Sequence, residues 1–325
     1  MATSRAKSGE GEGGREGGRG AGEPKDLIRA AREEEDDKAK QELLVKEGFL
    51  GPVTALCWCP VSEILLVGRG RDLSFMSLSR KIFGEIRCFE NGRIHGVRCV
   101  SSKVDGRSQI MAVVHSEKKI SIVSAKISKE ATDGDAELLV VCKDWMMDDW
   151  IMDVHTLTVD EAERSRQSSI EDLTRSCLVA VGLAHNVIQI LEVRTRSVQQ
   201  TVRCSEQPLL CSLNFSGSTL GNLRVACAGF TREILCWGFA GLDSAPVEQR
   251  LRGHTGVIHS VRWREDGAAL VSASEDRSVI LWLQTRGEAG AWPIFHRSAT
   301  FWGHAARIWD CQGPLDSPPE GTMAQ

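Results

Sequence analysis

The chain has 325 residues, enough for one large all-β domain or for two domains of average size. Its hydrophobic fraction of 42%, charged fraction of 26% and formal net charge of -4 exclude a protein that attracts nucleic acid through its overall charge. Residues 1–48 carry 10 Lys/Arg against 12 Asp/Glu, so this segment is not basic either. A contact with nucleic acid would have to come from a local patch or from a partner protein.

The first 48 residues have the composition of an arm rather than of a folded domain. Residues 1–24 are mostly Gly, Glu, Arg and Ser, which bury too little apolar surface to offset the entropy of ordering, so we predict disorder. Residues 25–48 are charged and rich in helix formers, which predicts a helix or linker that leads into the domain.

Residues 49–311 change to short apolar runs separated by turn residues, such as EILLVGRG and NVIQILEV. These runs are rich in Val and Ile and too short for amphipathic helices, so they predict β-strands. Four strands form a unit, and the unit recurs along the segment. Residues 160–175 interrupt the pattern with a charged insertion, which we predict to be an exposed loop.

The best-formed unit is the stretch 253–282, GHTGVIHSVRWREDGAALVSASEDRSVILW, which resembles one blade of a WD-repeat β-propeller. A second Gly-His pair, Gly303-His304, marks the next blade, and the insertion 286–292 lengthens the interval between the two pairs. Strands are predicted at 257–263, 269–275, 278–282 and about 294–300.

The resemblance to WD blades also implies a buried hydrogen-bond chain of four side chains. Carried over to this sequence, they are His254, Ser272, Asp276 and Trp282. The His, Ser and Asp could instead be taken for a hydrolase triad. Ser272 lies in mid-strand and no G-x-S-x-G elbow occurs, so we interpret the group as structural and predict no catalytic residue.

Several strings together resemble the WD-repeat protein 6 family: PVTALC, RIHGVR, MMDDWIMDV, VAVGLAHNVIQILEV, SEDRSVILW and FWGHAARIWD. That resemblance implies a cytoplasmic, non-catalytic scaffold of several propellers. It implies that the scaffold binds a tRNA ribose methyltransferase and supports 2′-O-methylation of the wobble nucleotide. The tRNA itself would be contacted indirectly or through a local patch.

The expected fold is therefore all-β, an incomplete WD-repeat propeller of about five blades plus the first strand of a sixth. Residues 312–325 contain three prolines and no strand pattern, which predicts a disordered tail. We expect the chain to be a truncated form of the family's longer proteins.

Residues 144–153, DWMMDDWIMD, are the candidate partner-binding stretch, because aromatic residues and Met are enriched in interface cores. The candidate residues are Trp145, Asp148, Asp149, Trp150 and Asp153. The alternative is a blade junction in which Trp150 and Met152 face inward and Asp153 caps a turn.

The eleven cysteines are an odd number of mostly scattered residues, which indicates free thiols in a reducing compartment. The close pair Cys57 and Cys59 lacks the second ligand pair of a zinc site, so we interpret both as strand cysteines. No apolar run approaches the roughly 18 residues of a membrane span. We predict no metal, no cofactor, no small-molecule substrate and no membrane contact.

Three other functions remain open from the sequence. The chain could be a generic WD-repeat adaptor, such as a substrate receptor for ubiquitin ligation. It could be an enzyme with a site in the central channel, although its 8 His form no cluster in the sequence. It could also be a truncated product without a function of its own.

Overall fold

The computed structural model describes residues 52–79, 81–104, 106–128, 136–158, 177–206, 208–242, 244–285 and 293–312. The predicted arm (1–24), the predicted helix (25–48), both predicted insertions and residues 313–325 of the predicted tail lie outside these ranges. Across the described ranges, no helix is both long and apolar enough to cross a lipid bilayer.

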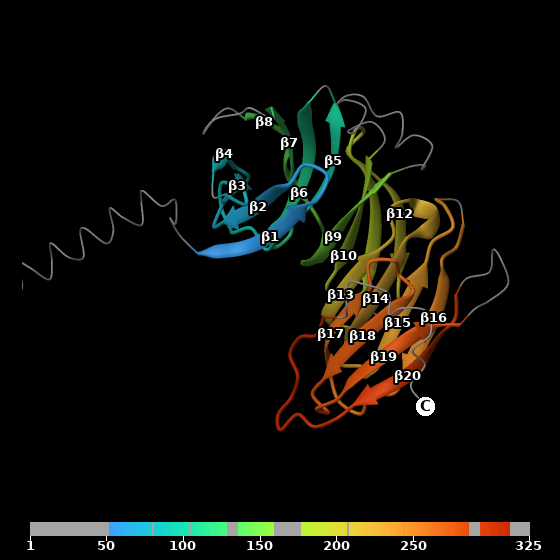
Figure 1. The fold of residues 1–325 in the computed structure, drawn as a ribbon. Coiled ribbons are helices and arrows are strands. Elements are labelled where there is room, and N and C mark those ends of the chain that lie inside the picture. Colours follow the sequence, from blue (N-terminus) through green and yellow to red (C-terminus); the bar gives the residue numbers. More distant parts are fainter. Residues whose placement is uncertain are drawn as a thin grey trace, which may run out of the picture. The chain divides into compact units, whose positions relative to one another are not determined.

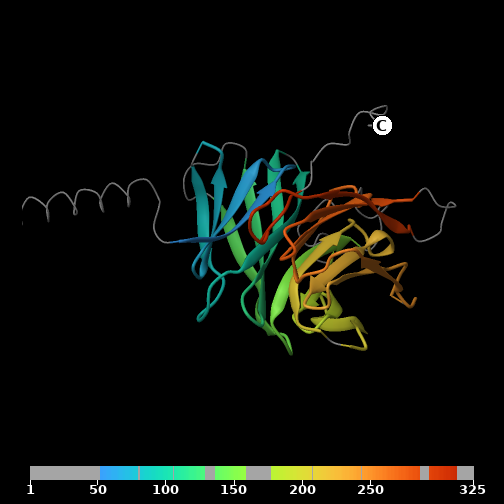
Figure 2. The same ribbon diagram turned by 90° about the horizontal axis from the view of Figure 1, so that it is seen from below.

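Within the described residues, twenty strands form five antiparallel sheets of four, which follow the chain from blue to red (Figures 1 and 2). In each sheet the strands pair in chain order, each with its sequence neighbours. This is the repeated four-stranded unit that the sequence predicts. We call each sheet a blade, and its first strand in the chain the inner strand.

The first two blades contain β1 (Val53–Cys59), β2 (Ile64–Arg69), β3 (Asp72–Ser77), β4 (Ile82–Arg87), β5 (Gly96–Val104), β6 (Arg107–His115), β7 (Lys119–Ser128) and β8 (Glu137–Met146). The third and fourth contain β9 (Ile151–Thr158), β10 (Cys177–Leu183), β11 (Val187–Glu192), β12 (Ser197–Arg203), β13 (Leu210–Ser216), β14 (Arg224–Gly229), β15 (Glu233–Gly238) and β16 (Val247–Arg252), with the 3-10 turn η1 (Leu220–Asn222) after β13. The fifth contains β17 (Ile258–Trp263), β18 (Ala269–Ser274), β19 (Val279–Gln284) and β20 (Phe295–Phe301).

The hydrophobic core lies between consecutive blades rather than inside any one of them. Successive side chains of a strand point to opposite faces, so one strand serves two interfaces. In β14, Val225 and Cys227 pack toward the third blade, whereas Ala226 and Ala228 pack toward the fifth. The second strands are therefore apolar on both faces, and the unbroken burial of β10 and β18 follows from this arrangement.

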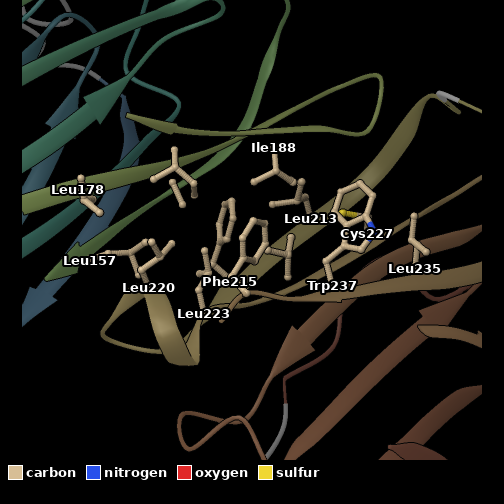
Figure 3. Close-up of a cluster of buried hydrophobic side chains, with 14 of the residues drawn as sticks. Leu157, Leu178, Ile188, Leu213, Phe215, Leu220, Leu223, Cys227, Leu235 and Trp237 are labelled. Atoms are coloured by element: carbon tan, nitrogen blue, oxygen red, sulfur yellow. The ribbon is translucent and has the colours of Figure 1, made fainter. Parts of the chain in front are cut away.

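The interface between the third and fourth blades is shown in Figure 3. Leu157, Leu178 and Ile188 from β9, β10 and β11 belong to one buried cluster with side chains of the fourth blade. The largest of these is Trp237, which is 2% exposed. Burying apolar surface contributes a stabilising free energy of about 25 cal/mol per Å², so the side chains of this cluster hold the two blades together.

A backbone hydrogen bond marks three of the junctions between blades. A residue at the start of an inner strand, or just before it, donates its amide to the second turn of the preceding blade: Ile94 N to Gly70 O (2.6 Å), Ile151 N to Glu117 O (2.7 Å) and Leu210 N to Ala184 O (2.8 Å). In the segment after the fifth blade, Ile308 N donates in a similar way to Ser274 O of that blade (3.1 Å).

Residues 302–312 differ from the predicted first strand of a sixth blade, because they contain no strand. Ile308 makes the backbone hydrogen bond to the fifth blade, the Asp310 carboxylate accepts a hydrogen bond from Ser260 Oγ at 2.5 Å, and Trp309 lies 4.4 Å from the His259 ring. An inner strand pairs only with the second strand of its own blade, and the described residues hold no such partner for this segment. The segment therefore docks on the fifth blade without forming a ladder.

Two ion pairs occupy equivalent places at the second and fifth blades. Arg98 on β5 reaches Asp153 on β9 at 3.0 Å, and Arg262 on β17 reaches Asp310 at 3.4 Å. Each arginine also donates to the carbonyl oxygen of the residue before it, at 3.2 Å in both cases. Both arginines end an Ile-His-x-Val-Arg string, so the sequence repeats where the contact repeats.

We predict that Asp153→Ala lowers the free energy of unfolding by about 1–3 kcal/mol, because it leaves the Arg98 guanidinium and the Val154 amide without their acceptor. The Asp153 side chain is 11% exposed, whereas Asp310 is 69% exposed. The matched variant Asp310→Ala should therefore cost less than about 1 kcal/mol. Urea unfolding of both variants checks this, and equal losses would contradict it.

Candidate functional site

The structure brings the four side chains of the predicted WD tetrad together in the fifth blade. Trp282 Nε1 donates to Ser272 Oγ at 2.9 Å, and Ser272 Oγ lies 2.8 Å from His254 Nε2. His254 Nδ1 lies 3.0 Å from Asp276 Oδ2. The loop before β17, strand β18, the turn after it and strand β19 each supply one residue, so the chain of bonds ties all four segments together.

Donor and acceptor roles in this chain require a neutral His254. Burial lowers the pKa of His254 despite the opposite pull of Asp276. With the proton on Nδ1, the imidazole donates a hydrogen bond to Asp276 and its Nε2 accepts one from the Ser272 hydroxyl. The Ser272 oxygen in turn accepts a hydrogen bond from the Trp282 indole. Every member then has a partner, which is the condition for burying such a group at low cost.

The Asp276 carboxylate also binds the turn around it. It accepts the Thr255 amide at 2.8 Å, the Ser278 amide at 2.9 Å and the Ser278 hydroxyl at 2.5 Å. Burial alone would raise the pKa of Asp276, but these hydrogen bonds and that from His254 outweigh it and lower the pKa to about 2. Ser278 was missed in the sequence, although its place two residues after Asp276 is where a hydroxyl can bond an Asp in a turn.

Ser272, His254 and Asp276 are the residue types of a catalytic triad, but a substrate cannot reach them. The Ser272 residue and the His254 side chain are both 0% exposed, and each is already hydrogen bonded within the blade. A nucleophile has to reach its substrate from an open surface. The arrangement therefore suits a structural role, as the resemblance to WD blades implies.

The predicted partner-binding residues divide into two groups. Trp145 lies in β8 and packs against the core between the second and third blades, and Asp153 lies in β9, 8% exposed and paired with Arg98. Both residues therefore make contacts within the fold.

Asp148, Asp149 and Trp150 lie in the connection between β8 and β9. Trp150 is 48% exposed and stacks on the His95 ring at 6.5 Å, so the alternative in which it faces inward is wrong. Asp149 Oδ2 lies 2.7 Å from His185 Nδ1 and accepts the His185 amide at 3.1 Å. Burial alone would raise the pKa of Asp149, but the hydrogen bonds from His185 and from the Trp150 amide lower it.

Asp148 is exposed, and its backbone oxygen accepts a hydrogen bond from Lys118 Nζ at 3.2 Å. The connection thus presents one free carboxylate and one half-exposed indole, held by contacts to the turns of the second and third blades. We call Asp148 and Trp150, with the His95 ring behind the indole, the Trp150 surface. It is what remains of the predicted stretch as an accessible site.

Other exposed apolar side chains lie at the same end of the later blades. In an antiparallel blade, the connection before the first strand and the turn between the second and third lie at one end. Leu209 (49% exposed) and Phe230 (60%) lie in such segments, and Trp309 (64%) follows Ile308, which bonds to Ser274 at the same end of the fifth blade. No local pattern marks these residues, because they lack the cluster of aromatic and acidic residues found in 144–153.

The opposite end of the third to fifth blades holds a cleft of about 570 Å³. Phe215, Arg224, Trp263 and Asp266 are among the residues that line it. The Arg264 guanidinium in its wall binds the Asp266 carboxylate through two hydrogen bonds, of 2.8 and 2.6 Å. These residues come from β13, β14, β17 and the β17–β18 turn, which are far apart in the sequence, so no local sequence pattern predicts the cleft. Among the described residues, no group of three or more His, Cys, Asp or Glu could hold a metal ion.

The tetrad generates a prediction about stability and pH. Asp276→Ala should lower the free energy of unfolding by about 1–3 kcal/mol at neutral pH, because it orphans His254 and two amides. The folded pKa of Asp276 lies below its unfolded value, so this contribution is present above about pH 4 and is lost as the pH falls toward 2. The difference between wild type and variant should shrink over that interval.

Urea unfolding at stepped pH measures this difference. Asp266→Ala is the matched control, because Asp266 pairs with Arg264 in the preceding turn of the same blade but is 46% exposed, and it should cost less than about 1 kcal/mol. A loss for Asp276→Ala that stays constant down to pH 2 would contradict the proposed role of its carboxylate.

Comparisons with known proteins agree with this fold. A family model described as WD domain, G-beta repeat, matches residues 246–282, the span of the tetrad. The tRNA (34-2'-O)-methyltransferase regulator WDR6 of Mus musculus is 30% identical over 278 residues, which cover 81% of this chain and 22% of that protein. The protein of the same name from Homo sapiens is 28% identical over 279 residues, with the same two shares.

Among solved structures, the WD40 beta propeller domain of Doa1 superposes with a TM-score of 0.47 and 15% identity, covering 80% of this chain and 72% of that one. The chain spans about a fifth of the length of the curated relatives it matches. Its five four-stranded blades and its WD repeat make it a WD-repeat β-propeller protein, similar over about four fifths of its length to the regulators named WDR6.

Proposed function

We propose that the chain is a non-catalytic WD-repeat scaffold that binds a tRNA 2′-O-methyltransferase and supports methylation of the wobble nucleotide. The observation that carries this proposal is the similarity to proteins named as regulators of that methyltransferase, which extends over 81% of the chain. The similarity extends well beyond the single recognised repeat, residues 246–282. The chain spans only about a fifth of the length of those relatives, so a shared activity is a proposal for this chain.

The chemistry of the described residues supports a role in binding rather than in catalysis. The arrangement of Ser272, His254 and Asp276 is closed to solvent, and its side chains are hydrogen bonded to one another within the blade. Several exposed apolar side chains, among them Trp150, Leu209 and Phe230, lie on connections at one end of the blades. A protein of this kind positions a partner that carries the catalytic residues.

The Trp150 surface is the proposed contact for the methyltransferase. Trp residues supply much of the binding energy at protein interfaces, and Trp150 combines a half-exposed indole with a pre-ordered position on His95. Asp148 adds a negative charge at its edge, which favours a basic patch on the partner. The tRNA would be contacted through the methyltransferase or through a local patch, since the net charge of the chain is -4.

The proposed compartment is the cytoplasm. All eleven cysteines are free thiols in the structure, which fits a reducing environment. A generic WD-repeat adaptor remains the alternative function, and the experiment below separates it from the leading proposal by the identity of the captured partner.

Full-length protein with an affinity tag should capture the tRNA 2′-O-methyltransferase of the same organism. The double variant Asp148→Lys with Trp150→Ala should weaken capture at least about tenfold, as expected when a buried aromatic contact of about 1.4 kcal/mol or more is lost. Asp148 is chosen over Asp149 because Asp149 holds His185, and its replacement would also disturb the turn.

Two control variants make comparable changes at other exposed positions of the chain. Phe230→Ala removes an aromatic side chain that is 60% exposed on the fourth blade, and Glu265→Lys reverses an exposed charge at the opposite end of the fifth. Both should bind as wild type does. Capture of an unrelated protein without the methyltransferase would favour the generic adaptor, and equal capture by wild type and double variant would remove the Trp150 surface from the proposal.

A further inference from the structure

A group of thiols lies where the first blade meets the second. Cys57 on β1 and Cys99 on β5 place their sulfur atoms 3.7 Å apart, which is van der Waals contact for two sulfurs. Both strands are inner strands, so the contact joins two blades that no backbone ladder connects. Neither residue is fully buried, whereas seven other cysteines are.

The third thiol of the group, Cys59, also interacts with Cys99, and that hydrogen bond lowers the pKa of Cys59 to about 5, but the residue is closed to solvent. Cys59 follows Cys57 by two residues and therefore points to the same face of β1. Its Sγ donates to Ser101 Oγ at 2.9 Å, and the residue is 1% exposed. Cys57 is thus the thiol of β1 that both reaches Cys99 and can be reached from solvent.

The surroundings give the two contacting thiols unequal acidity. The hydrogen bond with Cys99 lowers the pKa of Cys57, against the effect of burial, and the positive charge of Arg98 lowers it further. The same contacts with the thiols of β1, together with burial, raise the pKa of Cys99. Thiolate character therefore gathers on β1, while Cys99 keeps its proton.

We propose that Cys57 and Cys99 are a peroxide-responsive thiol pair that forms a reversible disulfide between the first and second blades. The Cys57 thiolate attacks one oxygen of hydrogen peroxide, giving a sulfenic acid and hydroxide. The Cys99 sulfur then attacks the Cys57 sulfur, its proton leaves with the sulfenic hydroxyl as water, and the S–S bond forms. The two sulfurs lose two electrons, and the peroxide gains them.

The geometry suits this step. The sulfurs have to close from 3.7 Å to about 2.05 Å, a change that rotation of two side chains can share. The residues are 42 positions apart, so the bond closes a long loop and adds a covalent link to an interface that side-chain packing and backbone hydrogen bonds such as Ile94 to Gly70 already hold. The pair is independent of the Trp150 surface, and its test does not depend on the proposed function.

The test treats the purified full chain with hydrogen peroxide at low protein concentration, then alkylates the remaining thiols in denaturant and maps the tryptic peptides. We expect a peptide that contains Cys57 joined to one that contains Cys99, protection of two of the eleven thiols, and full reversal by dithiothreitol. This measurement is made on the wild type and requires no variant to fold.

Serine variants assign the sulfurs, because trypsin leaves Cys57 and Cys59 in one peptide. Cys59→Ser and Cys211→Ser, the latter a half-buried thiol on β13, should keep the linked peptide. Cys57→Ser should abolish it, and Cys99→Ser should leave Cys57 as a sulfenic acid that dimedone traps. Absence of the linked peptide in wild type, or its persistence in Cys57→Ser, would overturn the proposal.

Discussion

Each four-stranded blade can bury its faces only against the blades before and after it, and the rest of the structure depends on this constraint. All four buried clusters lie between consecutive blades. The alternation of side chains along one strand therefore serves two interfaces, as Val225 and Ala226 of β14 show. Backbone hydrogen bonds such as Ile151 N to Glu117 O set where an inner strand begins relative to the preceding blade. Blade-to-blade contact is thus the unit of stability, as in other repeat proteins.

The same constraint explains where reactive side chains are found. His254, Ser272 and Asp276 tie together the loop, strand and turn of one blade, and their polar atoms are engaged in those hydrogen bonds. Arg98 and Asp153 join two blades by an ion pair, and Cys57 and Cys99 meet across another junction. On the connections at the blade ends, by contrast, Trp150 and Phe230 are exposed.

The stretch 253–282 shows how far local pattern reaches. Each of its four tetrad residues stands at a set distance from a strand or turn, so the pattern predicts their contact once a blade is assumed. The segment FWGHAARIWD carries a similar beginning, yet residues 302–312 form no strand, because a strand exists only with a hydrogen-bonded partner. The stretch 144–153 divides for a similar reason: Trp145 and Asp153 fall on strands that neighbouring blades cover, whereas Asp148 and Trp150 fall between strands.

The sequence by itself determined the all-β class and the four-stranded unit, because strand alternation and turn chemistry are local properties of the chain. The four tetrad residues followed from the resemblance of 253–282 to a WD blade. Only the tertiary structure decided which of these residues meet across blades. The contact of Cys57 with Cys99, the Arg98–Asp153 pair and the stacking of Trp150 on His95 join residues 42 or more positions apart. Such pairs depend on how two sheets align face to face, a relation that no spacing within one blade encodes.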